Sequence, residues 1–562
     1  MATPRDLEPP VARPAPIAPP PPALRRPMVG WFDPGPLITT AFDVVVSTMF
    51  GRHSDYRLLE ALATADQEEY FDYRTEATGE VRSEIWIDYV ADTGDGWNST
   101  YAIAYWLTRP EIPATSEAGD RVNTRPGHLL VFGGDQVYPT ANRRDYQDRL
   151  VRPFETARNY SHAPAPDVFA LPGNHDWYDS LVSFTRLFCS QRWFQGWRTR
   201  QRRSYFALRL PGRWWLIGTD FQLGSDIDAL QVSYFKRVAA SMREGDRIIL
   251  CSAEPHWVLS ETYRDLDPDM NENNLHYLER VFDRAGATTL VYLAGDLHHY
   301  RRHAHATGAQ KITAGGGGAF LHPTHGADVR ELTGGFALKA AYPPEAISRR
   351  LAWRNLLFPF INPRFGWVTA SVYALAGWWW QTGGLGRIVG PLLIILGFVL
   401  FTDTHSAWYR RVAGSLHGLA HLTAAYALAG LGAELAAGLG ELAPGVAAWS
   451  LSSTVVTGLV LFGGGWVVGS FLMGLYLLVS LNAFGRHANE AFSSLHIEDY
   501  KHFLRLHIGP DGVLRIFPLG IDRVPRRWRP VANATAYDAQ LEPDDPDSTS
   551  PRPIEPAVRV DG

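Results

Sequence analysis

Short apolar runs that end in polar residues repeat along residues 84–317, and this rhythm restricts the fold more than any other feature of the chain. Each run has the length and composition of a buried strand. Residues 146–160 and 275–286, which lie between runs, have helical patterning instead. Strands that alternate with helices predict an α/β sheet. The polar clusters that end the runs are Asp92-Thr93-Gly94-Asp95, Gly134-Asp135-Gln136-Val137-Tyr138, Gly173-Asn174-His175-Asp176, His256, Gly295-Asp296-Leu297-His298 and Gly315–Gly318.

These polar clusters predict a metal site. Chemistry in open α/β sheets gathers beyond the carboxyl ends of the strands, and every cluster falls there. Asp, Asn, His and Tyr are hard or borderline ligands, suited to Mn, Fe or Zn. Carboxylates that converge without a metal would repel one another and lose their hydration. Two divalent cations remove both costs, and a carboxylate that bridges them holds them ~3.5–4 Å apart, the spacing used for in-line displacement at phosphorus.

The motifs DTG, GDQVY, GNHD, PH and GDLH follow one another in this order over residues 92–298. This ordered set resembles the calcineurin-like metallophosphoesterase superfamily, and the Asp-x-Gly and Gly-Asp-x-x-Tyr motifs are similar to those of its purple acid phosphatase branch. The resemblance implies a β-sandwich flanked by helices, formed by residues 84–350. It also implies two divalent or mixed-valence transition metal ions, Mn, Fe or Zn, as cofactors.

The resemblance further implies a role for each residue of these motifs. The implied ligands of the first metal are Asp92, Asp135, Tyr138 and His298, and those of the second are Asp135, Asn174, His256 and Asp296. His175 is the implied general acid for the leaving oxygen, and Asp176 orients it. Asp296 stands where the family pattern has a histidine. Gly94 stands where many members have a ligating histidine, a place left to Tyr138 or Asp95.

The reaction implied by the resemblance is hydrolysis of a phosphate ester. A hydroxide shared by the two metals attacks phosphorus in line, and the metals and His175 stabilise the charge that develops on the oxygens. His322 follows the glycine-rich loop and is a candidate substrate-binding residue. Arg143 and Arg144 are further candidates for binding the substrate phosphate, although they fit equally well as solvated surface arginines.

Residues 363–485 are almost free of charge and predict an α-helical transmembrane bundle that interrupts the chain. The four candidate spans are 367–381, 388–401, 412–433 and 451–481. The last is long enough to cross once or to break at Gly463-Gly464-Gly465 into two passes. Arginines gather on one side of the four spans, which the positive-inside rule makes cytoplasmic. They are Arg349, Arg350, Arg354, Arg364, Arg410, Arg411 and Arg486.

The remaining segments are predicted from composition. Residues 1–28 are proline-rich and predict a disordered tail. Residues 29–83 are expected to form a helical or linker segment close to the membrane. Residues 486–526 contain two apolar-rich runs around Gly-Pro-Asp-Gly, which predict a hairpin that returns to pack on the phosphoesterase domain. Residues 527–562 are expected to be a polar tail.

Together these features predict an integral-membrane, dinuclear metal-dependent phosphoesterase in the cell membrane, with its catalytic domain and both termini in the cytoplasm. The expected substrate is a phosphorylated small molecule or a lipid-linked phosphate. An alternative is a non-catalytic membrane sensor or transport-linked protein whose phosphoesterase-like domain binds a phosphorylated ligand. The net charge of −5 gives no footprint for nucleic acid, and the two cysteines fit a reducing compartment. The oligomeric state is left open.

Overall fold

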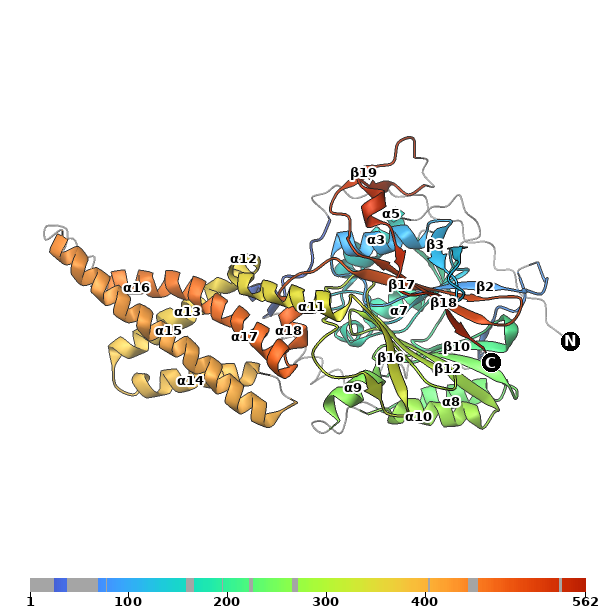
Figure 1. Ribbon diagram of the computed structural model, residues 1–562, viewed down its shortest axis with the longest axis horizontal. Coiled ribbons are helices and arrows are strands. Elements are labelled where there is room, and N and C mark those ends of the chain that lie inside the picture. Colours follow the sequence, from blue (N-terminus) through green and yellow to red (C-terminus); the bar gives the residue numbers. More distant parts are fainter. Residues whose placement is uncertain are drawn as a thin grey trace.

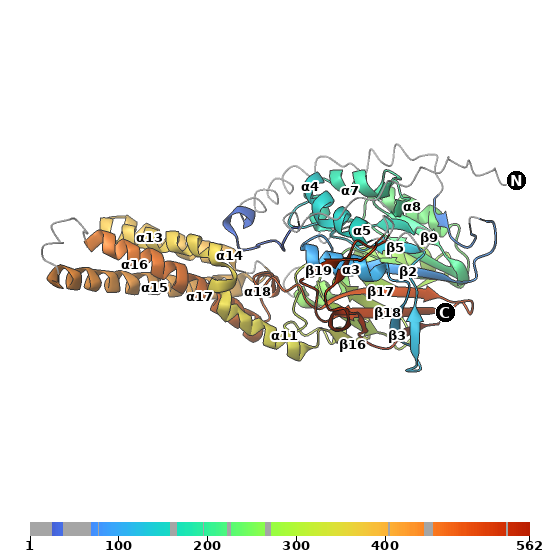
Figure 2. The same ribbon diagram turned by 90° about the horizontal axis from the view of Figure 1, so that it is seen from above.

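A computed structural model of the chain describes residues 25–37, 69–76, 78–157, 166–194, 196–221, 226–264, 271–402, 405–442, 453–534 and 538–561. Most of the proline-rich segment 1–28 and of the linker 29–83 lies outside the described residues. The chain forms an α/β body from which a bundle of helices projects (Figures 1 and 2). The predicted α/β class is therefore confirmed for the body.

Two nine-stranded sheets form the body. The first has the order β1 (Phe71–Asp72), β9 (Phe206–Arg209), β10 (Trp214–Gly218), β11 (Asp246–Cys251), β12 (Ala287–Ala294), β14 (Gln310–Ala314), β13 (Tyr300–Ala304), β16 (Phe336–Tyr342) and β15 (Glu331–Leu332). The second has the order β21 (Arg552–Pro553), β18 (Leu514–Ile521), β17 (Lys501–Ile508), β2 (Ile85–Val90), β5 (Leu129–Phe132), β6 (Asp167–Ala170), β8 (Trp197–Thr199) and β7 (Trp193–Phe194), with β22 (Val558–Val560) paired to β18.

The two sheets share one core because alternate residues of each strand face the partner sheet. Ile87 and Tyr89 of β2 pack into this shared core, together with Ile249 of β11 and Leu293 of β12. Side chains that point the other way are covered by helices. These are α3 (Trp97–Leu107), α5 (Arg152–Ala157) and α7 (Val182–Phe188) on the second sheet, and α8 (Ala229–Ala239), α9 (His256–Tyr263) and α10 (Asn273–Asp283) on the first.

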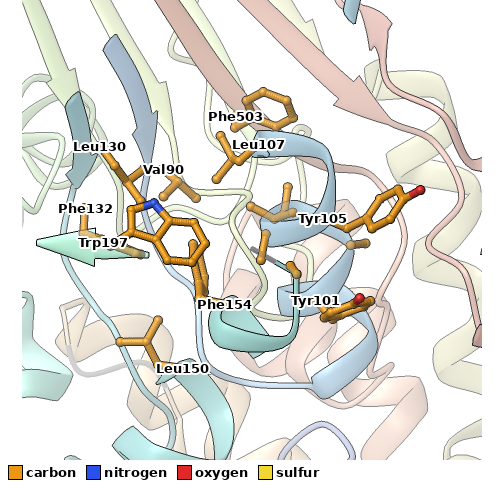
Figure 3. Packing of buried hydrophobic residues seen from close by; sticks show 14 of the residues in the cluster. Val90, Tyr101, Tyr105, Leu107, Leu130, Phe132, Leu150, Phe154, Trp197 and Phe503 are labelled. Atoms are coloured by element: carbon orange, nitrogen blue, oxygen red, sulfur yellow. The ribbon is translucent and has the colours of Figure 1, made fainter. Parts of the chain in front are cut away.

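Aromatic side chains fill the space between the second sheet and its helices. Phe132 of β5 lies 5.1 Å, centroid to centroid, from Phe154 of α5, which lies 5.5 Å from Trp197 of β8 (Figure 3). Tyr101 and Tyr105 extend the same cluster along α3. Strands β2, β5 and β6 are parallel neighbours, so their carboxyl ends lie at the same edge of the sheet. The aromatic packing supports this part of the sheet.

The C-terminal segment returns to the body after the helical bundle. Strand β17 pairs antiparallel with β2, with Leu504 opposite Tyr89. The prediction of a polar tail at 527–562 is wrong, because β21 and β22 pair with β18 and bury Val558 and Val560. Strands β19 (Trp528–Pro530) and β20 (Leu541–Pro543) form a hairpin that precedes α19 (Pro546–Thr549). Strands β21 and β22 have only two and three residues, too few to show a periodic pattern in the sequence, and they are stabilised by pairing with β18.

The bundle contains α13 (Gly366–Thr382), α14 (Gly386–Phe401), α15 (Ala407–Leu442), α16 (Ser453–Gly464) and α17 (Ser470–Phe484). A π-helical segment, Gly465–Gly469, joins α16 to α17, so the helix does not break at the glycines. Among the described residues, two helices, Ala407–Glu441 and Ser453–Phe484, are long and apolar enough to cross a membrane. Helices α13 and α14 have 17 and 16 residues and rise only about 25 Å each. A bundle with four full-length spans is therefore not confirmed.

Candidate functional site

The predicted ligands lie where neighbouring strands end. Asp92 follows β2, Asp135 follows β5, and Asp296 follows β12. The amide of Asp92 donates to Gly134 O (3.0 Å), and the amide of Asp296 donates to Asp92 Oδ2 (2.9 Å). These hydrogen bonds tie the ends of β2, β5 and β12 into one edge, although the residues are far apart in the sequence.

All three aspartates have a left-handed backbone conformation. Their φ angles are 59° for Asp92, 48° for Asp135 and 63° for Asp296. This region costs a non-glycine residue about 1–3 kcal/mol and persists only where the surroundings enforce it. The backbone of Gly315 also lies close to this site, because a Cβ atom at Gly315 would be only 2.6 Å from Asp92 Oδ2. The chain thus accepts strain to aim three carboxylates at one place.

The four residues predicted to hold the first metal meet at the Tyr138 hydroxyl. This hydroxyl lies 2.9 Å from Asp92 Oδ1, 2.9 Å from His298 Nε2 and 3.4 Å from Asp135 Oδ2. Asp95 is used differently, because its carboxylate accepts the amides of Val29 (2.7 Å) and Phe320 (3.2 Å). Of these two residues, Tyr138 faces Asp92 and His298, whereas Asp95 is engaged with backbone amides; which of them ligates a metal stays a prediction.

The orientation of the His298 ring is set by its other nitrogen. Nδ1 lies 2.7 Å from Phe320 O, so in the neutral ring Nδ1 carries the proton and Nε2 presents a lone pair toward Tyr138. The His322 ring stacks on His298 with centroids 4.1 Å apart, and its Nδ1 accepts the His298 amide. His322 is thus next to the site, stacked on the face of the His298 ring.

The residues predicted to hold the second metal have unused donor atoms. Asn174 Oδ1 and His256 Nε2 are buried and have no hydrogen-bond partner. Such orphaned polar atoms are costly in a folded protein unless something binds them. Asp135 lies between the two sets, because its Oδ2 faces Tyr138 while its Oδ1 accepts the His175 amide (2.9 Å).

Burial shifts the titration of these groups. Loss of hydration raises the pKa of Asp135 to about 7, and burial together with the charge of Asp135 raises the pKa of Asp296 to about 7. Burial raises the pKa of Asp92 well above its usual range, and Asp135 and Asp296 add to the effect. Burial lowers the pKa of His256 to about 4. Nearby cations would reverse the carboxylate shifts, whereas the neutral histidine is already in the form that binds a metal.

His175 and Asp176 are placed differently from the prediction. His175 Nδ1 lies 2.6 Å from Pro139 O, so a backbone carbonyl holds the ring. The carboxylate of Asp176 instead accepts the amides of Gly173 (2.9 Å) and Gln136 (3.2 Å) and the Tyr146 hydroxyl (2.5 Å). Asp176 therefore positions the backbone of two ligand-bearing loops, and it does not orient the imidazole.

Trp31 covers the site and was not identified from the sequence. Its ring lies 6.0 Å from His175, 6.1 Å from Tyr138 and 5.6 Å from Phe320, measured between centroids. The amide of the nearby Val29 anchors this segment to Asp95. Residues 29–33 follow a proline-rich stretch and carry no motif, so no local signal pointed to them.

Arg143 and Arg144 begin the short helix α4 (Arg143–Asp145) and are exposed. Arg144 Nε lies 3.6 Å from Asp148 Oδ2. Their role in binding substrate stays a prediction.

Two donor sets suit transition metals by chemistry. Among the residues that the structure describes, no three or more His, Cys, Asp or Glu side chains are grouped closely enough on their own to hold a metal ion. The two sets above also use Tyr138 and Asn174. The unpartnered Asn174 Oδ1 and His256 Nε2, together with the carboxylates of Asp92, Asp135 and Asp296, are donors of the kind that Mn, Fe or Zn ions bind.

Comparison with known proteins adds little. No family model and no curated protein matches the chain. A solved structure described as "GAP50 the anchor in the inner membrane complex of Plasmodium" is 12% identical, with a TM-score of 0.32, over 46% of this chain and 78% of that chain. A structure of PhoD is 12% identical, with a TM-score of 0.26, over 44% of this chain and 58% of that chain. Both similarities are too weak to carry a functional argument.

Proposed function

We propose that this chain is an integral-membrane, metal-dependent phosphoric ester hydrolase. The observation that carries the proposal is the meeting of Asp92, Asp135 and His298 at the Tyr138 hydroxyl. Carboxylate, imidazole and phenol donors meet at one point, beside the unpartnered Asn174 Oδ1 and His256 Nε2, and these are the donor types that transition metal ions bind.

Two transition metal ions are the proposed cofactors. Asp92, Tyr138 and His298 would hold the first, and Asn174, His256 and Asp296 the second, with Asp135 shared. When bound, such ions lower the pKa of water and neutralise charge on phosphoryl oxygens. Asp296 adds a negative charge where an imidazole would add none, which favours a harder second metal.

His175 is the proposed proton donor to the leaving oxygen. In the neutral ring Nδ1 donates to Pro139 O, so Nε2 is a bare lone pair. Burial lowers the pKa of His175 to about 4, and donation from Nε2 therefore requires the imidazolium. A bound phosphate dianion favours that charged form. Trp31 packs on the ring and shields it from bulk water.

The bundle α13–α17 is proposed to lie in the membrane, with the body on the cytoplasmic side. Most of the large exposed apolar side chains of the described residues are on these helices, among them Trp380, Leu392, Leu396 and Leu416. A surface of this kind is a liability in water and is expected against lipid. Arginines at the body side of the bundle agree with the positive-inside rule.

Two substitutions in purified full-length protein test the proposal. Asp135→Ala should remove bound metal and abolish hydrolysis of an aryl phosphate, because this carboxylate serves both ions. His175→Ala should keep the metal but lower kcat by about 10²–10⁴-fold, the usual contribution of general acid catalysis. Asp120→Asn, an exposed carboxylate in a turn, is the control. Wild-type rates in both Asp135→Ala and His175→Ala would refute the site, and bound metal without any turnover would favour a ligand-binding sensor.

A further inference from the structure

A cavity of about 350 Å³ with a mixed polar and apolar lining lies where the bundle meets the body, and we call it the junction pocket. It is lined on the body side by His299, Arg301 and His322, and on the bundle side by Phe401, Arg486 and His487. Helix α18 (Ala488–Ser493), which follows α17, marks this junction in Figure 1. The proposed function gives no role to these side chains, although His322 is a predicted substrate-binding residue.

Arg301 is an incompletely paired cation in this pocket. The residue is 6% exposed, and its Nη2 donates to Thr324 O at 2.8 Å while Nε has no partner. Within the described part of the chain, Arg301 forms no ion pair, and the acid that acts on its charge is Glu345. A buried guanidinium with so little compensation is costly unless an anion binds it.

Other side chains add hydrogen-bonding capacity. His299 is 2% exposed, and neither of its ring nitrogens has a partner of normal hydrogen-bond geometry. Arg486 supplies a second guanidinium from the bundle side. The acid that also lines the pocket, Glu490, lies 3.4 Å from His487 Nδ1. The junction pocket thus offers an environment suited to a phosphate group.

An apolar groove of about 300 Å³ runs between α15 and α17, next to the junction pocket. Val412, Ala413 and Leu416 line it from α15, and Leu475 and Val479 line it from α17. Tyr476 connects the two features, because its ring lines the groove while its hydroxyl lies 3.1 Å from Thr402 Oγ1 and 3.0 Å from His487 Nε2. Thr402 and His487 both line the junction pocket.

We propose that the junction pocket and the α15–α17 groove together bind an anionic membrane phospholipid. Its phosphate contacts Arg301, Arg486 and His299, and an acyl chain lies along the groove. Basic pockets between membrane helices on the cytoplasmic side recognise lipid headgroups in this way. A soluble phosphate would not use the groove. The inference rests on the membrane placement of the bundle, which is part of the proposed function, and is independent of metal binding and turnover.

The test is lipid binding to full-length protein in phosphatidylcholine nanodiscs, titrated with a fluorescent phosphatidic acid. Arg486→Gln and Arg301→Gln should each weaken binding about tenfold, since each removes a charge-assisted hydrogen bond. Arg411→Gln, an exposed arginine of α15 that does not line the pocket, is the matched control. Ala413→Trp fills the groove and should weaken binding of the long-chain lipid, but not of a short-chain analogue.

Two further arms separate the lipid site from the metal site. Asp135→Ala should bind phosphatidic acid as the wild type does, even if it proves inactive. Loss of lipid binding in that variant would place the lipid at the metal site and overturn the inference while leaving the proposed function intact. Wild-type binding by Arg486→Gln, or full competition by millimolar inorganic phosphate, would also overturn it. Arg486→Gln decides the outcome if Arg301→Gln does not fold.

Discussion

The α/β body and the helical bundle contain similar apolar residues but direct them in opposite ways. All six residues of β2 are buried, and so are all four of β5. In α14, by contrast, Leu392, Leu396 and Leu400 are about half exposed or more. A charged side chain should therefore lower stability when it is buried inside the body, whereas on the bundle it should be unfavourable at the outer surface. The candidate metal site formed by Asp92, Asp135 and Asp296 is one place in the body where buried carboxylates lie close together.

The largest effects are expected from substituting two buried lysines of the body, Lys311 and Lys501, which test the cost of buried charge. Lys311 Nζ lies 2.5 Å from Glu272 Oε2, so Lys311→Met should destabilise the fold by about 3–5 kcal/mol because it leaves a buried carboxylate unpaired. Lys501 is fully buried without a hydrogen-bond partner, and burial lowers its pKa to about 8. Lys501→Met should instead stabilise the fold by about 3 kcal/mol at pH 7.

The gain from Lys501→Met should depend on pH. Between pH 8 and about 10.4 the unfolded chain binds a proton that folded Lys501 does not, so wild-type stability rises with pH. The advantage of the variant should therefore be complete below pH 8 and disappear toward pH 10. Thermal unfolding of both lysine variants across this range measures the effect, and destabilisation by Lys501→Met at pH 7 would contradict it.

A leucine pair tests the bundle surface against the body surface. Leu396 on α14 and Leu230 on α8 are both exposed. If the bundle lies in lipid, Leu396→Asp should oppose membrane insertion by about 2.5–3.5 kcal/mol. Leu230→Asp on the water-facing body should change stability by no more than about 0.5 kcal/mol. Membrane fractionation and unfolding assays measure the two effects, and equal tolerance at both positions would mean that the bundle surface faces water.

Substitution of Trp31 should have the smallest effect of these changes, and the effect should be on catalysis. Trp31→Ala exposes His175 to water, which should move the His175 pKa upward from about 4 and lower kcat about tenfold or less. Because His175 acts as the imidazolium, the alkaline limb of the pH–rate profile, where that form is lost, should shift toward higher pH. Trp380→Ala, at an exposed position on α13, is the control and should leave the profile unchanged. An unshifted profile for Trp31→Ala would show that the ring does not shield His175.

The predictions that the structure confirms rest on local sequence patterns. Those that are wrong concern features that depend on contacts between residues far apart in the sequence. Buried runs such as residues 85–90 and 287–294 form strands because their apolar content is continuous. The contact between Tyr138 and Asp92 follows from two motifs at neighbouring strand ends. The Pro139 carbonyl that holds His175 and the short strands β21 and β22 depend on distant partners, which no local pattern reveals.

The most direct test of the central claim is to measure metal content and aryl phosphate hydrolysis in the same sample of purified wild-type protein. The proposed function predicts two transition metal ions per chain, with turnover that is lost on chelation and restored by adding metal back. A protein without stoichiometric metal would contradict the proposed site. Two bound metals with no hydrolysis of any phosphate ester would contradict the proposed activity and favour a membrane sensor.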